Sequence, residues 1–241
     1  MTSRACMLFA SVLAASAAIQ LAAAAPDDAL ELAREALEAT EAGSIEGWAF
    51  TETSVENGRK TVSRFDPRRP EGGQWSLVSV NDRPPTDEER QASAERRATE
   101  RQASESGGNG DGESVEIGAM IEPDSLRLIE ETEEFALYRF DPAKDDDDDS
   151  GFHQHVDATL KVVKAGPYVA TIDMRSRAPF KPQFGVKIDE FATMLTFEPQ
   201  DSGGPVLPRT VSVRVAGRAF LVKKIDEAVE VAYSDYELVG P

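Results

Sequence analysis

The sequence predicts a mainly β protein, an α+β fold built on one large and strongly curved antiparallel sheet. Stretches in which polar and apolar residues alternate recur along most of the chain, and this pattern indicates strands with one buried and one solvated face. Asn-Gly, Gly-Gly and Gly-Pro pairs between these stretches are typical of tight turns between antiparallel strands. A single sheet of about ten strands must curl or split. We expect it to curl into a half-barrel, with a two-sheet sandwich as the alternative.

A short helix should open the domain. Pro26 and two acids stand in its first turn, and apolar residues at Leu30, Ala33 and Leu37 recur at helical spacing. Gly43 is expected to end it. Because the apolar stripe is narrow, this helix should dock on a larger element.

The strands follow in two groups, and each strand is a short run with β character that ends at turn residues. The first group is predicted at residues 48–51, 61–65 and 75–80, and the second at 126–129, 135–140, 156–162, 168–174, 186–197, 211–222 and 229–233. Gly217 interrupts a run of alternating valines, which predicts a bulge or a bend at that point.

Residues 82–114 form a polar insertion between the two groups of strands. This stretch contains no aromatic residue and no Leu, Ile, Val or Met. Thr86 and Glu89 have the spacing of a capping box, which predicts a helix from Asp87 to Ser104. A glycine-rich linker follows at 107–112. Because the helix is polar on all sides, we expect it to project into solvent or to fray.

The first 24 residues predict a secretory signal peptide. Arg4 precedes an Ala- and Leu-rich stretch, and Ala22 and Ala24 stand in the A-x-A arrangement of a cleavage site. Cys6 lies before most of this stretch, which is the wrong place for a lipid-modified cysteine. We therefore expect a periplasmic protein with one domain over residues 25–241 and no stable membrane insertion after cleavage. An uncleaved membrane anchor is the alternative.

Composition excludes several classes of protein. The 241 residues include 44 Asp and Glu against 26 Lys and Arg, for a formal net charge of −18. A chain this acidic is unsuited to general nucleic-acid binding, or to being held at an anionic membrane by charge alone. The single cysteine excludes a disulfide framework and a Cys₄ zinc site. The hydrophobic content of 40% suffices for a core.

No group of residues makes a positive case for an enzyme or a metal site. The segment Asp201–Pro205 (DSGGP) resembles the nucleophile segment of chymotrypsin-like serine proteases, but His153 and His155 do not stand in the sequence context of that family's base. On a strand these two histidines could face one ion beside the acids at 145–149, yet no third ligand can be named. We predict a protein without catalysis, cofactor or bound metal.

The aromatic residues are the candidates for a binding site. A curled, open sheet with one helix cannot fill its concave side, which would leave an apolar cavity for acyl chains. The alternative is that each aromatic ring belongs to the ordinary core. The candidate cavity residues are Trp48, Phe50, Phe65 and Trp75 in the first strands, with Phe180 and Phe184 around a proline-rich bend.

The order of elements from Pro26 to about Tyr236 resembles the LolA/LolB-like outer-membrane lipoprotein-sorting proteins. The similarity rests on the helix that runs into Gly47-Trp48-Ala49-Phe50, on the Arg64-Phe65-Asp66-Pro67 strand exit before Trp75, and on the long C-terminal meander. The resemblance implies a periplasmic carrier whose half-barrel receives lipid chains, closer to the soluble carriers than to the lipid-anchored acceptors. The insertion at 82–114 departs from the family's pattern.

Two functional hypotheses follow. The first is a non-enzymatic periplasmic carrier of a lipid, a lipoprotein or another apolar ligand. The second is an envelope regulatory or scaffold protein on the same fold, whose cavity is filled by its own side chains. Such a protein would bind a membrane-protein partner through a sheet edge or through the polar helix.

Overall fold

The computed structural model describes residues 26–41, 43, 45, 47–105, 117–122, 124–144, 151–201, 204–220 and 223–239. These residues form two α-helices, two short 3₁₀ helices and eleven strands. In chain order they are α1 (Pro26–Glu41), β1 (Trp48–Glu56), β2 (Arg59–Phe65), β3 (Trp75–Val80), α2 (Asp87–Glu105), η1 (Gly118–Met120), β4 (Arg127–Glu131), β5 (Phe135–Phe140), η2 (Phe152–His155), β6 (Val156–Val163), β7 (Tyr168–Ser176), β8 (Phe180–Gln183), β9 (Val186–Pro199), β10 (Val206–Ala219) and β11 (Lys223–Leu238). The predicted signal peptide and the glycine-rich linker lie outside the described residues.

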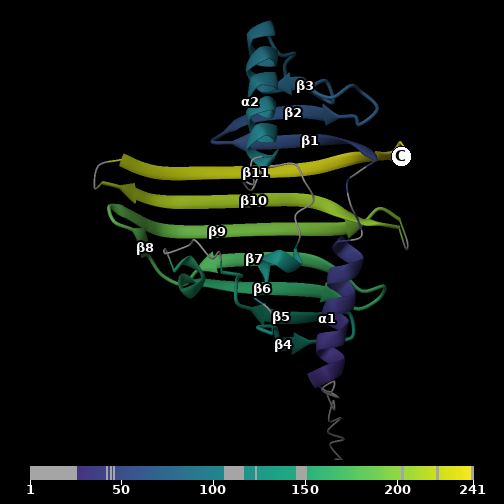
Figure 1. Ribbon diagram of the computed structural model, residues 1–241, viewed down its shortest axis with the longest axis vertical. Helices are drawn as coiled ribbons and strands as arrows, with labels where there is room; N and C mark the ends of the chain where they lie inside the picture. Colours follow the sequence, from purple (N-terminus) through teal and green to yellow (C-terminus); the bar gives the residue numbers. More distant parts are fainter. Residues whose placement is uncertain are drawn as a thin grey trace, which may run out of the picture.

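All eleven strands belong to one open antiparallel sheet, which confirms the predicted fold class and excludes the sandwich. The strand order is β3-β2-β1-β11-β10-β9-β7-β6-β5-β4, and β8 pairs with β9 off this path. β1 and β11, close to the two ends of the described chain, lie side by side near the middle of the sheet (Figure 1). Both helices lie on the same face of the sheet, which we call the concave face (Figure 1).

The irregularity predicted at Gly217 is present, but the extra residue, Asp189, is on the partner strand β9 opposite it. The register between β9 and β10 shifts between Ala216 and Gly217. A Cβ atom on Gly217 would overlap the carbonyl oxygen of Lys187, so only glycine fits where the two strands come this close. β8, which was not among the predicted strands, lies in the proline-rich bend. β9, β10 and β11 extend beyond the ranges that the alternation of polar and apolar residues predicted.

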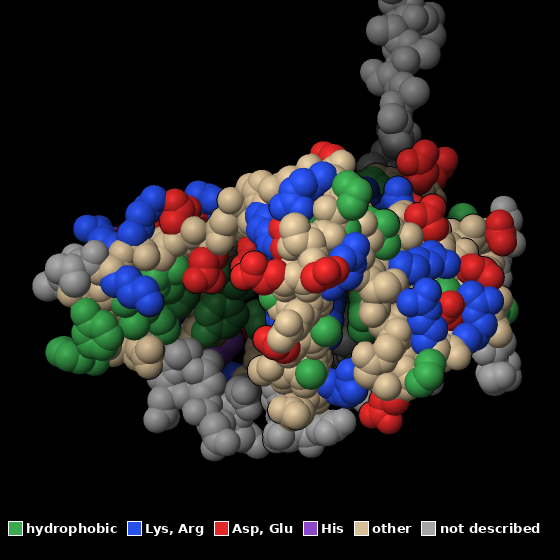
Figure 2. Space-filling model, turned by 90° about the horizontal axis from the view of Figure 1, so that it is seen from above, with side chains coloured by type: hydrophobic (Ala, Val, Ile, Leu, Met, Phe, Trp, Pro, Cys, Tyr) green, Lys and Arg blue, Asp and Glu red, His purple; other side chains and the backbone are tan. Residues whose placement is uncertain are grey.

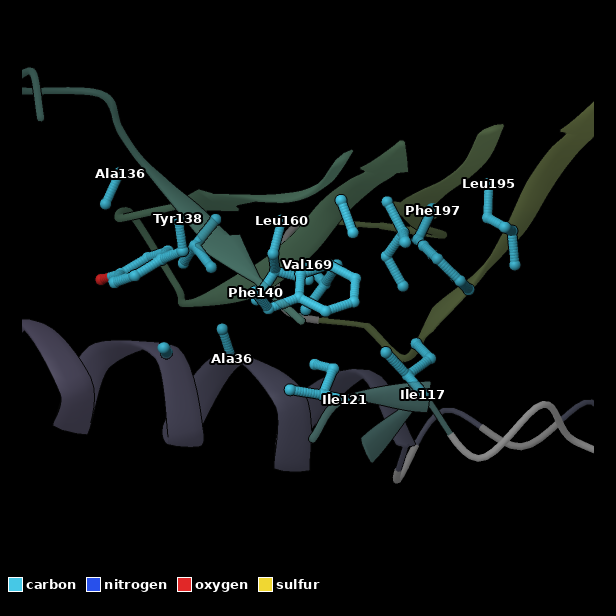
Figure 3. Packing of buried hydrophobic residues seen from close by; sticks show 14 of the residues in the cluster. Ala36, Ile117, Ile121, Ala136, Tyr138, Phe140, Leu160, Val169, Leu195 and Phe197 are labelled. Atoms are coloured by element: carbon cyan, nitrogen blue, oxygen red, sulfur yellow. The ribbon is translucent and has the colours of Figure 1, made fainter. Parts of the chain in front are cut away.

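The main core lies between α1 and strands β4 to β7, β9 and β10. α1 begins at Pro26 as expected, and its fully covered face consists of Ala29, Ala33 and Ala36. These small side chains allow the helix to approach the sheet closely, so that Tyr138, Phe140 and the neighbouring aliphatic residues fill the layer between them (Figure 3).

Two polar groups in this layer find partners across it. The Tyr138 hydroxyl donates to the carbonyl of Ala29 at 2.6 Å, and the backbone N–H of Val169 donates to the hydroxyl of Thr40 at 2.9 Å. Burial raises the pKa of Tyr138 to about 12. The two hydrogen bonds fix the position of α1 along the strands.

α2 covers the other end of the concave face, over β1 to β3. The capping box is confirmed, because the Thr86 N–H donates to Glu89 at 2.8 Å and the Glu89 N–H donates to the Thr86 hydroxyl at 3.2 Å. The Arg83 guanidinium and the Thr86 backbone hold the pKa of Glu89 down to about 2. In contrast to the expectation of a projecting helix, α2 is tied to the sheet, and it is tied by arginines instead of apolar residues.

Candidate functional site

The concave face carries a strip of partly exposed valines between its two covered ends. Val211 of β10 is paired with Leu195 of the core, so alternation places Val213 and Val215 on the same face. On β11, Val231 is paired with Val211 and Val229 with Val213. All five valines are partly buried. Val211 packs against the core under α1, and Val229 is paired with Glu56, which forms an ion pair with α2.

A recess lined by hydrophobic side chains opens beside α2 on this side of the molecule (Figure 2). Two small hollows also lie among the described residues. One, of about 50 Å³, lies between β3 and α2 and is lined by Trp75 and Arg97. The other, of about 120 Å³, lies on the opposite, convex face around Met194 and Ser212. Neither reaches the roughly 300 Å³ of a small-molecule pocket, so a ligand of lipid size would have to lie in an open recess.

Four of the six candidate cavity residues come together under α2. The rings of Phe50, Phe65 and Trp75 contact one another with centroids 5.1–5.6 Å apart. Trp48 joins them through Tyr236, whose ring lies 6.1 Å from Trp48 and 5.7 Å from Phe50. Phe50 is buried and the other three candidates are partly buried. These rings therefore fill one end of the concave face with a second, aromatic core.

Phe180 and Phe184 lie elsewhere. Phe180 is buried and stacks on His155 at 4.8 Å, beside Phe152 of η2. Phe184 is 97% exposed, because it stands in the β8–β9 turn, where Gly185 has a φ of +82°. The six candidates therefore do not line one common cavity. Four belong to the aromatic core, Phe180 stacks on η2, and Phe184 is an exposed turn residue.

A buried ion pair connects α2 to the aromatic core. Arg97 donates to Glu52 of β1, and its guanidinium carbon lies 4.0 Å from the centroid of the Trp75 ring. A second contact joins Arg97 to Glu100 at 3.3 Å. Burial raises the pKa of Glu52, and the nearby Arg97 charge opposes this rise.

The histidines do not form the metal site that a strand position would have allowed. His153 and His155 belong to η2, and two residues two apart on a 3₁₀ helix point in different directions. No cluster of three or more metal-ligating side chains occurs within the described residues. The acids at 145–149 and Ser202 of the protease-like segment lie outside those residues.

Sequence reasoning missed Tyr233, Tyr236 and Arg97. Both tyrosines contact Phe50 from β11, whose pairing with β1 joins segments more than 150 residues apart in the chain. Arg97 is one of several arginines on a polar helix, and nothing in its local sequence marks it as the one that is buried. The valines of the strip alternate with polar residues in the sequence, but this pattern predicts only a strand with one buried face and does not mark a binding site.

Comparison with family models, with curated proteins and with solved structures finds no match to this chain. Among the described helices, none has both the length and the apolar character to cross a bilayer.

Proposed function

We propose that this protein is a non-catalytic periplasmic carrier that holds an apolar ligand, such as a lipid or the lipid part of a lipoprotein, on its concave face. The observation that carries the proposal is the strip of partly exposed valines between α1 and α2. The resemblance to lipoprotein-sorting proteins and the signal-peptide pattern at 1–24 support the same conclusion.

The valine strip suits an acyl chain. Burying an acyl chain contributes roughly 0.8 kcal/mol per methylene, so affinity can arise without any polar recognition. The strip is apolar apart from Glu227, which is paired with Val215, and the face becomes charged under α2, where Arg96 forms an ion pair with Glu56. An acyl chain lying along β10 and β11 would therefore keep its polar end near α2.

Substitution on opposite faces of one strand tests the proposal. Val213→Asp places a charge on the concave face, and the matched control Ser212→Asp places the same charge one residue away on the convex face. We expect the full chain to bind a fluorescent fatty acid, and Val213→Asp to weaken this binding at least about tenfold while Ser212→Asp leaves it unchanged. Organic extracts of the purified protein should contain a reproducible lipid by mass spectrometry.

Equal binding by the two variants, with clean extracts, would contradict the carrier proposal. Circular dichroism of both variants separates a loss of binding from a loss of folding.

A second candidate function is the scaffold that binds a membrane-protein partner. It is favoured by exposed apolar side chains on both edge strands, Val78 on β3 and Ile129 on β4, which are 52% and 47% exposed. An open edge strand can pair with a strand of another protein. Clean extracts combined with a partner captured through β3 or β4 would favour this function over the carrier.

A further inference from the structure

Two neighbouring turns at one end of the sheet carry exposed phenylalanines. Phe184 in the β8–β9 turn is 97% exposed and Phe220 after β10 is 69% exposed. The Phe220 N–H donates to the carbonyl of Gly185 at 2.6 Å, which joins the two turns. The Phe220 ring rests on Gly185, where a Cβ atom would lie 2.8 Å from it. Phe220 has a φ of +49°, an uncommon backbone conformation for an aromatic residue.

These turns end a ribbon that extends beyond the rest of the sheet, which we call the tip. β11 is paired with β1 only from Val229 onward, and β9 is paired with β7 only from Ala192 onward. Beyond these points, β8 to β11 continue with no further strand beside them (Figure 1), and η2 contacts the ribbon through Phe180 and Phe191. At about 3.3 Å per residue, the six residues 186–191 span roughly 20 Å.

Only the outer part of the tip is basic, because four acids, Asp189, Glu190, Asp226 and Glu227, follow closer to the body of the sheet. Segments 180–188 and 217–225 contain no Asp or Glu. They contain five basic residues, which are Lys181, Lys187, Arg218, Lys223 and Lys224. On the tip itself, Lys187 and Arg218 form ion pairs with Asp189, and Lys224 forms one with Asp226. Within the described part of the chain, no ion pair involves the exposed Lys181 or Lys223.

We propose that the tip docks reversibly on an anionic lipid surface, with Phe184 and Phe220 inserted among the headgroups and the lysines against the phosphates. Exposed aromatic rings flanked by basic side chains match the chemistry of the bilayer interface, where rings occupy the headgroup level and lysine stems reach the phosphates. The ribbon is longer than the Debye length of about 8 Å at physiological salt, so the acids on the body of the protein are largely screened from the membrane. This inference goes beyond the carrier function and does not depend on it.

Vesicle sedimentation of the full chain tests the proposal. We expect binding to vesicles that contain phosphatidylglycerol, weak binding to pure phosphatidylcholine, and a loss of binding at high salt. Phe184→Ser should weaken binding about five- to tenfold, and Lys223→Ser about fivefold. The matched controls are Ile129→Ser on the edge strand β4 and Arg69→Ser in the exposed β2–β3 loop, and both should bind as the wild type does.

A Phe184→Trp variant gives a second readout. Its tryptophan emission should shift to shorter wavelength when anionic vesicles are added, because the ring leaves water. Absence of vesicle binding, or equal binding by Phe184→Ser and the wild type, would overturn the proposal. So would a change in oligomeric state of Phe184→Ser without vesicles, since the tip would then be a contact between copies of the chain.

Val213→Asp distinguishes this inference from the carrier function. Docking through the tip predicts that Val213→Asp binds vesicles normally even where it has lost the fatty acid. If instead Val213→Asp loses vesicle binding while Phe184→Ser keeps it, the membrane is contacted through the concave face and the tip proposal fails.

Discussion

Glu52 is a buried carboxylate, and its side chain forms an ion pair with Arg97 of α2. Its side chain is 10% exposed and that of Arg97 is 12% exposed. Removing both charges from water is costly, and their attraction offsets this cost only while the geometry holds. The Nε of Arg97 is buried without a hydrogen-bond partner in the described structure, so the pair is incompletely satisfied. The pair therefore serves to position α2 more than to stabilise the fold.

Arg97→Ala should destabilise the protein by about 3 kcal/mol in urea unfolding, because it leaves the Glu52 charge buried and unpaired. Adding Glu52→Gln to Arg97→Ala should recover part of this loss, since it removes the buried charge. Arg90→Ala, on the same helix in an exposed ion pair with Asp87, should have little effect. Equal destabilisation by Arg97→Ala and Arg90→Ala would show that the Glu52 pair is solvated.

At the scale of elements, the two helices are held to one sheet by opposite means. α1 presents buried alanines to the strands, and its long apolar side chains Leu32 and Leu37 lie at the border of the core. α2 presents arginines and an N-terminal capping box. The mode of attachment follows from composition, because α2 contains no side chain that could join a hydrophobic core apart from alanine.

The close approach of α1 makes its alanine face sensitive to volume. Ala33→Leu should destabilise the protein by about 1–3 kcal/mol, because Ala33 is fully buried against the sheet and the added atoms force the helix outward. Glu35→Leu, on the exposed face of the same helix, should leave the urea midpoint nearly unchanged. A tolerated leucine at position 33 would mean that α1 is loosely seated.

The sequence predicted most elements because their signals are local. The capping box at Thr86, the irregularity at Gly217 and the alternation in β6 and β7 each depend on residues close together in the chain. The prediction that α2 projects into solvent was wrong. The polar composition of the helix cannot show that Arg97 contacts Glu52, which lies on a strand 45 residues earlier. Four of the candidate aromatic residues gather in one cluster, but the pairing of β1 with β11 decides which other rings join them.

At the scale of the whole molecule, one sheet supports regions of very different burial. Under α1, β6 and β7 carry fully buried side chains, among them Leu160, Val162 and Ile172. The tip, formed by the same sheet, has no strand beside it, and outside its own strands the ring contacts it makes are with η2, through Phe180 and Phe191. The molecule thus combines a well-buried core under α1 with an exposed ribbon at one end of the long strands.

Hydrogen exchange followed by mass spectrometry should report this difference. Backbone amides in the ladder between β6 and β7 should exchange slowest, since they open only with the core. Amides of β10 and β11 in residues 217–228 should exchange much faster, although they belong to equally regular ladders. Equal protection in both ladders would indicate that the sheet unfolds as one cooperative unit from tip to core.

The sequence by itself determined that this chain forms an antiparallel sheet, where most of its strands and helices begin, and that its composition is acidic. Alternation, turn residues and helix caps act between neighbours in the chain, so they can be recognised without the fold. Only the tertiary structure decided that both helices share one face, that Glu52 is buried under Arg97, and that two distant turns place Phe184 beside Phe220. These features depend on strand register across the sheet, which arises when segments far apart in sequence pack together.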